Sequence, residues 1–152
     1  MKKNVWLIIC LLLSLMAYSP ETTAQTAPKL FEPQALYTIR FERERFVRYF
    51  YTSYMGSIVY RVDGLDEILR EKYVKRALLK RKTGADVLLD AQDCIEENLK
   101  TLNVEAIDDD WYRVSFLWPS AYPAIPPRRH VILVKVDGIK NSSKIVDIKV
   151  EH

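Results

Sequence analysis

Few residues of this sequence are of types that could do chemistry, and they are spread along the chain. Asp93 or His130 could act with Tyr112 in general acid–base catalysis, because carboxylates, imidazoles and phenols transfer protons when they lie within hydrogen-bond reach of a substrate. The thiol of Cys94 would need a neighbouring base to lower its pKa, and neither histidine is close in sequence. We therefore expect Cys94 to be a small buried residue.

Other catalytic and cofactor signatures are missing from the sequence. It has no Ser/His/Asp set, no His/Cys cluster with metal-ligand spacing and, with four glycines in all, no glycine-rich phosphate loop. We expect no metal, no cofactor and no catalytic residue.

The N-terminus has the pattern of an export signal. Two lysines precede the apolar run VWLIICLLLSLM, which is too short to span a bilayer, since a spanning helix needs about 20 residues. Small residues at Thr22 and Ala24 predict cleavage before Gln25, which makes 1–24 a signal peptide and leaves no stable membrane span; an uncleaved anchor is the alternative. Residues 25–34 contain two prolines and predict a flexible lead-in, and residues 35–152 predict one domain.

Charge and cysteine content limit the partners. Removal of the signal leaves 21 basic against 19 acidic residues, a near balance that does not point to nucleic acid. Cys10 is removed with the signal, so Cys94 has no partner for an intramolecular disulfide. Export predicts a periplasmic or secreted protein that is stabilised by packing.

Hydrophobic periodicity predicts helices in the first half of the chain. Large side chains from Phe46 to Tyr54 recur at helical spacing, Gly56 is expected to end that helix, and residues 36–41 fit either a strand or a helix. Further helices are predicted over 65–82 and 86–102. The outer face of the second helix is basic and that of the third is acidic. These faces could pair, or the basic face could bind anionic lipid headgroups, an acidic partner or nucleic acid.

Alternation of apolar and polar residues predicts four strands in the second half, over 102–106, 112–118, 131–137 and 145–150. The side chains expected to face inward on the last three strands are Tyr112, Val114, Phe116, Trp118, Ile132, Val134, Val136, Val146, Ile148 and Val150. A sheet with one apolar face must bury it, and the helical half is the material available. The sequence therefore predicts an α+β fold with N-terminal helices packed on a curved antiparallel four-stranded sheet.

Two candidate binding sites follow from this arrangement. The inward face offers a pocket lined by Tyr112, Phe116, Trp118 and His130, and it carries no carboxylate, so it suits holding an apolar small molecule better than transforming one. The proline-rich segment 119–129 offers a stiff loop for contact with a protein. The loop residues expected to make that contact are Tyr122, Pro126, Arg128 and Arg129. A plain hairpin connection is the alternative for this loop.

Several short motifs carry a family resemblance over residues 40–150. They are Phe46–Tyr51, the Gln92–Asp93 pair, the Trp111–Tyr112 strand start and Lys144–Ile148. With this order of elements, the chain resembles small exported bacterial proteins of unknown function with a nuclear transport factor 2-like (cystatin-like) cone fold, similar to domain-of-unknown-function family 3828. The resemblance implies a cone of helices against a bent sheet, often with a ligand pocket. Members similar to ketosteroid isomerase place an acid and a tyrosine inside, whereas the inward faces here lack the acid.

These observations favour a non-catalytic binding module of the cell envelope, whose ligand is an apolar small molecule or an envelope protein. One version is an immunity-like protein that blocks a toxin with the 119–129 loop. A small enzyme of the ketosteroid-isomerase-like type, using the acid and tyrosine named above, is the alternative. One sheet edge could also pair in a homodimer.

Overall fold

The computed structural model describes residues 31–81, 84–120 and 124–151, and the predicted signal peptide lies outside them. Residues Glu32–His152 form one compact unit. Within the described part, no helix is both long and apolar enough to cross a membrane. The elements are α2 (Phe31–Val59), α3 (Leu65–Tyr73), α4 (Arg76–Leu79), α5 (Glu96–Lys100), β1 (Asn103–Ala106), β2 (Trp111–Trp118), β3 (Arg128–Asp137), the 3-10 turn η1 (Lys140–Ser142) and β4 (Lys144–Val150).

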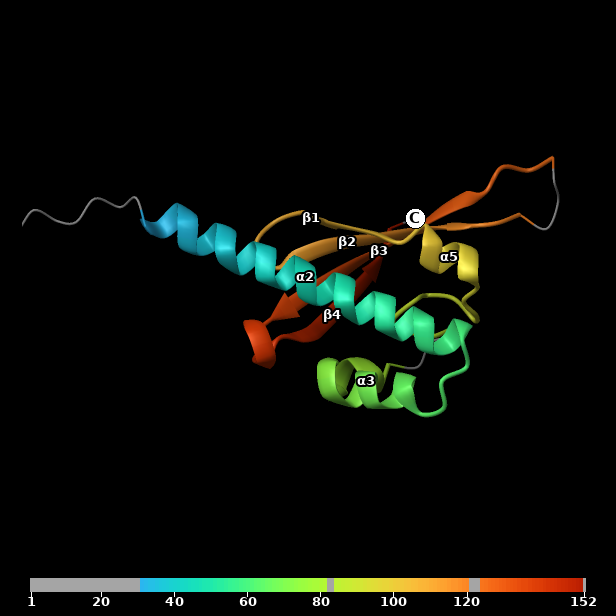
Figure 1. The fold of residues 1–152 in the computed structure, drawn as a ribbon, viewed down its shortest axis with the longest axis horizontal. Helices are drawn as coiled ribbons and strands as arrows, with labels where there is room; N and C mark the ends of the chain where they lie inside the picture. The colour runs from blue at the N-terminus through green and yellow to red at the C-terminus, as the bar shows by residue number, and fades with distance from the viewer. Residues whose placement is uncertain (1–30, 82–83, 121–123, 152) are drawn as a thin grey trace, which may run out of the picture. The chain divides into compact units, whose positions relative to one another are not determined.

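Helix α2 runs alongside the sheet and supplies much of the core (Figure 1). Its inward stripe repeats at helical spacing, and each of its members is at most 1 % exposed: Val47, Phe50, Tyr51, Tyr54 and Met55. The helix begins at Phe31, inside the predicted lead-in, and it includes the ambiguous segment 36–41. It also passes Gly56, where we expected it to end. It ends instead at Val59; just beyond it Arg61 takes a left-handed conformation (φ 52°), and Val62 N–H bonds to Ser57 O.

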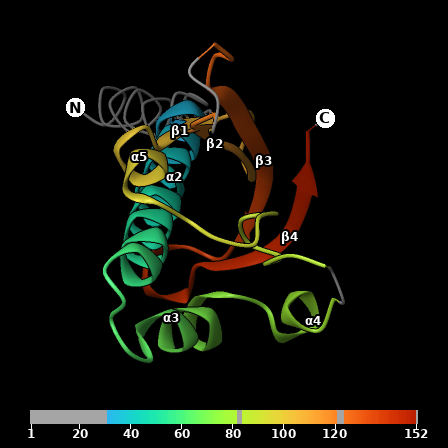
Figure 2. The same ribbon diagram turned by 90° about the vertical axis from the view of Figure 1, so that its right-hand side faces the viewer.

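The four strands form an antiparallel meander in the order β1-β2-β3-β4, which confirms the predicted α+β class and sheet. Figure 2 shows β3 bent, with α2 on one side of the strands and α3 and α4 along β4. The predicted inner face of β2 and β3 is fully buried in one core with α2: Tyr112, Val114, Phe116, Ile132, Val134 and Val136 are at most 1 % exposed. Trp118 at the end of β2 is half-buried.

The inner face of β4 differs from the prediction. Ile145 is fully buried, whereas Val146, which we expected inside, is only half-buried. The cause is a bulge: Lys135 pairs with Asp147, but Val136 pairs with Ile145, so one residue of β4 has no partner. A bulge exchanges the two faces of a strand on one side of it, and alternation alone does not reveal it.

The second and third predicted helices are both interrupted. The second breaks at Val74, which is extended and forms a parallel bridge with Ile145, so only α3 and the short α4 remain. In the third, residues Asp86–Ala91 form a turn, because the Asp86 carboxylate accepts a hydrogen bond from Leu88 N–H (2.7 Å) and Asp86 N–H bonds to Ala91 O (3.0 Å). Leu88 is thereby buried under α2, where Tyr51 donates to its carbonyl (2.9 Å).

Candidate functional site

The residues predicted for acid–base chemistry do not lie together. Tyr112 is fully buried, and its hydroxyl lies 3.3 Å from the carbonyl oxygens of Arg40 and Asp109, at the turn between β1 and β2. His130 pairs across the sheet with Phe116, four residues further along β2, which separates it from Tyr112 by roughly 13 Å of strand. Asp93 is exposed, and its carboxylate accepts from Cys94 N–H (2.7 Å). A general acid and a general base must both reach the same substrate, whereas the Tyr112 hydroxyl faces two backbone carbonyls.

Cys94 is buried as expected, with 5 % of its surface exposed. Burial, and secondly the neighbouring Asp93 carboxylate, raise the pKa of its thiol to about 11, so the thiol stays protonated at neutral pH. Among the residues that the structure describes, no three His, Cys, Asp or Glu side chains gather closely enough to hold a metal ion.

The predicted pocket residues divide between the core and the surface. Phe116 is 1 % exposed and packs against the rings of His130 (5.1 Å) and Trp118 (6.3 Å). His130 Nε2 lies 2.9 Å from Leu89 O, which only accepts, so this nitrogen carries the proton. Tyr112 and Phe116 are therefore part of the buried core.

Four predicted residues do meet at the end of the sheet, although the sequence assigned them to two sites. Trp118 and His130, from the pocket, line a hollow of about 330 Å³ together with Arg128 and Arg129, from the loop. Both arginines belong to β3, not to the loop, and both are exposed, as is Pro126. Tyr122 lies outside the described residues.

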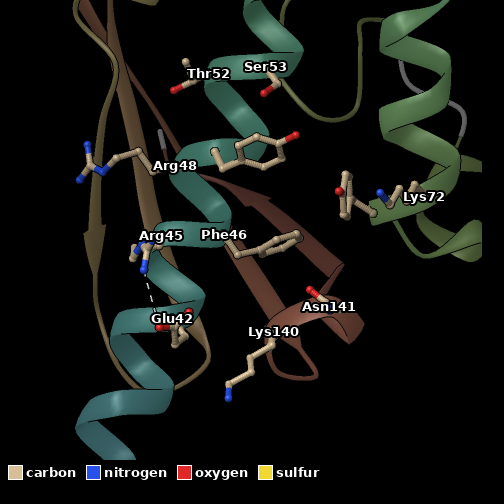
Figure 3. A pocket seen from close by; sticks show the side chains of 11 residues that line it. Glu42, Arg45, Phe46, Arg48, Thr52, Ser53, Lys72, Lys140 and Asn141 are labelled. Carbon is tan, nitrogen blue, oxygen red and sulfur yellow. Dashed lines mark ion pairs between the residues drawn. The ribbon is translucent and has the colours of Figure 1, made fainter.

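A larger groove, of about 750 Å³, lies on the outer side of α2 (Figure 3). Sequence reasoning did not identify it. One wall is a stripe of α2 at helical spacing, another is the end of α3, and η1 closes one end. The lining residues are Glu42, Arg45, Phe46, Arg48, Tyr49, Thr52, Ser53, Lys72, Tyr73, Lys140 and Asn141. The stripe on α2 could have been predicted from helical periodicity. The residues of η1 lie about 90 residues further along the chain, and no local sequence pattern places them beside α2.

Three aromatic side chains form the apolar part of the groove. The ring of Tyr73 packs edge-on against Phe46 (5.6 Å between centroids) and against Tyr49 (6.3 Å). Tyr49 remains 56 % exposed, and Phe46 and Tyr73 are half-buried. Such edge-on contacts hold rings in place, so the groove presents an ordered apolar surface to solvent.

The charged side chains of the groove are mostly cationic. Arg45 pairs with Glu42 (3.8 Å), and the Lys72 ammonium lies 4.8 Å from the centre of the Tyr73 ring. Interaction with the Tyr73 hydroxyl raises the pKa of Lys72, which favours its charged form. Lys140 sits at the closed end with a left-handed backbone (φ 53°), an uncommon conformation for a lysine. Arg48 points away from the groove and bonds to Val104 O.

This arrangement suits binding. The groove offers apolar rings, hydroxyl groups of Thr52 and Ser53, and cations, but its one carboxylate is already paired with Arg45.

Comparison with known proteins supports the fold but does not indicate an activity. The chain is similar to a protein of unknown function from Bacteroides thetaiotaomicron whose crystal structure is known, with a TM-score of 0.62 and 26 % identical residues. The match covers 78 % of this chain and 98 % of that one, so the neighbour corresponds in size to the compact unit described above. No protein-family model matches the chain, and no curated protein does so significantly.

Proposed function

We propose that this protein is an exported, non-catalytic binding module of the cell envelope that engages its partner through the groove between α2 and α3. One observation carries the proposal: the inner face of the sheet is filled by its own side chains, while three aromatic rings stay half-exposed in an open groove. Apolar surface that remains exposed in an ordered groove is typical of an interaction site.

We also infer that the fold is of the nuclear transport factor 2-like kind. The long helix α2 beside a bent four-stranded meander supports this inference. In such a cone the interior would be the usual place for a ligand, but here Tyr112 and Phe116 occupy it. The partner therefore belongs on the outer side of α2.

The binding proposal is tested by photo-crosslinking in cells that express the full chain. A benzophenone amino acid replaces Tyr49 in the groove, and in a matched control it replaces Tyr60, which is 63 % exposed beyond the end of α2. We expect one discrete crosslinked species from position 49 and none from position 60. Equal labelling from both positions, or none from either, would contradict the proposal.

The export proposal has a separate test. Fractionation of the same cells should place the protein in the periplasm or the medium, and mass spectrometry should show a mature chain that begins at Gln25. An intact chain that still carries Met1 and sediments with membranes would favour the uncleaved anchor.

A further inference from the structure

We propose that the occupant of the groove is an acidic amphipathic segment of another protein, with apolar side chains on the rings of Phe46, Tyr49 and Tyr73 and carboxylates beside Lys72 and Lys140. This inference rests on the proposed binding function and names the class of partner.

The charges of the groove favour an acidic partner. Of the four cationic residues at the groove, Arg48 points away from it, so three cations stand against the single carboxylate of Glu42. Arg48 is engaged with Val104 O and Glu44, and Arg45 is paired with Glu42. Lys72 and Lys140 have no ion-pair partner within the part of the chain that the structure describes, so a partner with carboxylates at both places would complement them.

The dimensions favour a chain segment over a small molecule. The α2 wall from Glu42 to Ser53 is about 16 Å long at 1.5 Å per helical residue. That length matches about five extended residues or three helical turns. A small ligand is normally buried over 70–90 % of its surface. The groove is open beside Tyr49, which is itself 56 % exposed, and would leave a small ligand largely in water.

The apolar surface also continues beyond the groove along α2. Tyr37 and Phe41 are 71 % and 50 % exposed, and with Arg45 and Tyr49 they follow one row at a spacing of four residues. The Arg45 guanidinium lies 5.8 Å from the Phe41 ring and links the two parts of the row. A segment that leaves the groove at this end would meet further aromatic side chains, which a compact ligand would not reach.

The test is a selection from a library of displayed random peptides of about twelve residues, slightly more than three helical turns. The bait is the purified mature protein. Enriched peptides are measured by fluorescence anisotropy against the wild type, Tyr49→Ser and the double variant Lys72→Glu/Lys140→Glu. Lys144→Glu, an exposed lysine on β4 outside the groove, is the control for charge reversal at a single site. Circular dichroism checks that all four proteins are folded.

We expect the enriched peptides to combine Asp or Glu with Leu or aromatic residues. Their affinity should fall about tenfold or more in Tyr49→Ser and in the double variant but not in Lys144→Glu, and it should weaken with added salt. Enrichment of neutral or basic peptides, or equal binding to the double variant, would overturn the acidic class.

A small aromatic anion, anilinonaphthalene sulfonate, provides the competing arm. Tyr49-dependent binding of this dye without any enriched peptide would assign the groove to small molecules and overturn the inference. Position 49 could crosslink to a partner that binds the wild type and Lys72→Glu/Lys140→Glu equally well. That result would support the binding function and contradict only the acidic class of partner.

Discussion

Arg48 of α2 donates a hydrogen bond of 2.8 Å to the carbonyl oxygen of Val104, on the outer edge of β1. Arg40, two turns earlier, does the same for Ala106 O at 2.9 Å. These carbonyls point away from β2, so without the arginines they would be free to pair with another strand. The opposite edge is also occupied: Lys75 N–H bonds to Ile145 O (2.8 Å) and Arg81 to Ile148 O (3.2 Å). Pairing with a second copy along β1 would require both arginines to leave.

Replacing both Arg40 and Arg48 by methionine should therefore expose the β1 edge. We expect a loss of about 1–3 kcal/mol in the free energy of unfolding, because two half-buried carbonyls lose charged donors. We also expect concentration-dependent self-association, measured by analytical ultracentrifugation.

Arg45→Met is the matched control for that variant, since Arg45 lies on the same helix and contacts Glu42, not the sheet. It should keep the association state of the wild type, with almost unchanged stability. If Arg40→Met/Arg48→Met behaved like Arg45→Met, the two bonds would have no role in protecting the edge.

What could be read from the sequence is what depends on local periodicity. The alternation from Tyr112 to Phe116 and the spacing from Val47 to Tyr54 each report a buried face directly, and both were predicted. The break at Val74 was not predictable, because Val74 leaves the helical conformation to form a bridge with Ile145, 71 residues away. The groove could not be predicted for a similar reason. Its walls come from α2, α3 and η1, and only the stripe on α2 has a local sequence pattern.

The bulge in β4 can be tested with two neighbouring residues. Ile145→Ala should lower the free energy of unfolding by about 2–4 kcal/mol, because Ile145 is fully buried and its removal leaves a cavity. Val146→Ala, at the half-buried position that alternation alone would place inside, should cost about 1 kcal/mol or less. Urea denaturation of both variants measures the difference. The reverse order would mean that β4 has the regular register.

Two glycines should respond to alanine in opposite directions. Gly56 lies inside α2 with no atom within 4 Å of where a Cβ would stand, so Gly56→Ala should stabilise the protein by up to about 1 kcal/mol through helix propensity. Gly138 has a φ of 82°, and a Cβ there would meet Ser142 O, so Gly138→Ala should cost about 2 kcal/mol or more. Thermal unfolding of the two variants measures the direction of each change in stability. A destabilising Gly56→Ala would show that α2 does not continue through this position.

Alkaline pH should destabilise the fold, and Cys94 should be the first buried group to contribute. Burial raises the pKa of its thiol from an ordinary 9.0 to about 11. Below pH 9 the thiol is protonated in both states, so stability does not depend on it. Between pH 9 and 11 the unfolded chain loses the proton while the folded one keeps it, and stability falls as pH rises.

We expect this thiol to account for about 1–2 kcal/mol of the loss between about pH 8 and pH 10.5. The urea midpoint of each protein is measured under reducing conditions at the two pH values. The decrease in stability between them should be smaller for Cys94→Ala than for the wild type. Burial, together with the hydrogen bond to Asp86, raises the pKa of Tyr54 still further. A decline above pH 10 should therefore persist in Cys94→Ala and become shallower in Tyr54→Phe. Identical pH dependence in the wild type and Cys94→Ala would mean that the thiol titrates equally in the folded and unfolded chains.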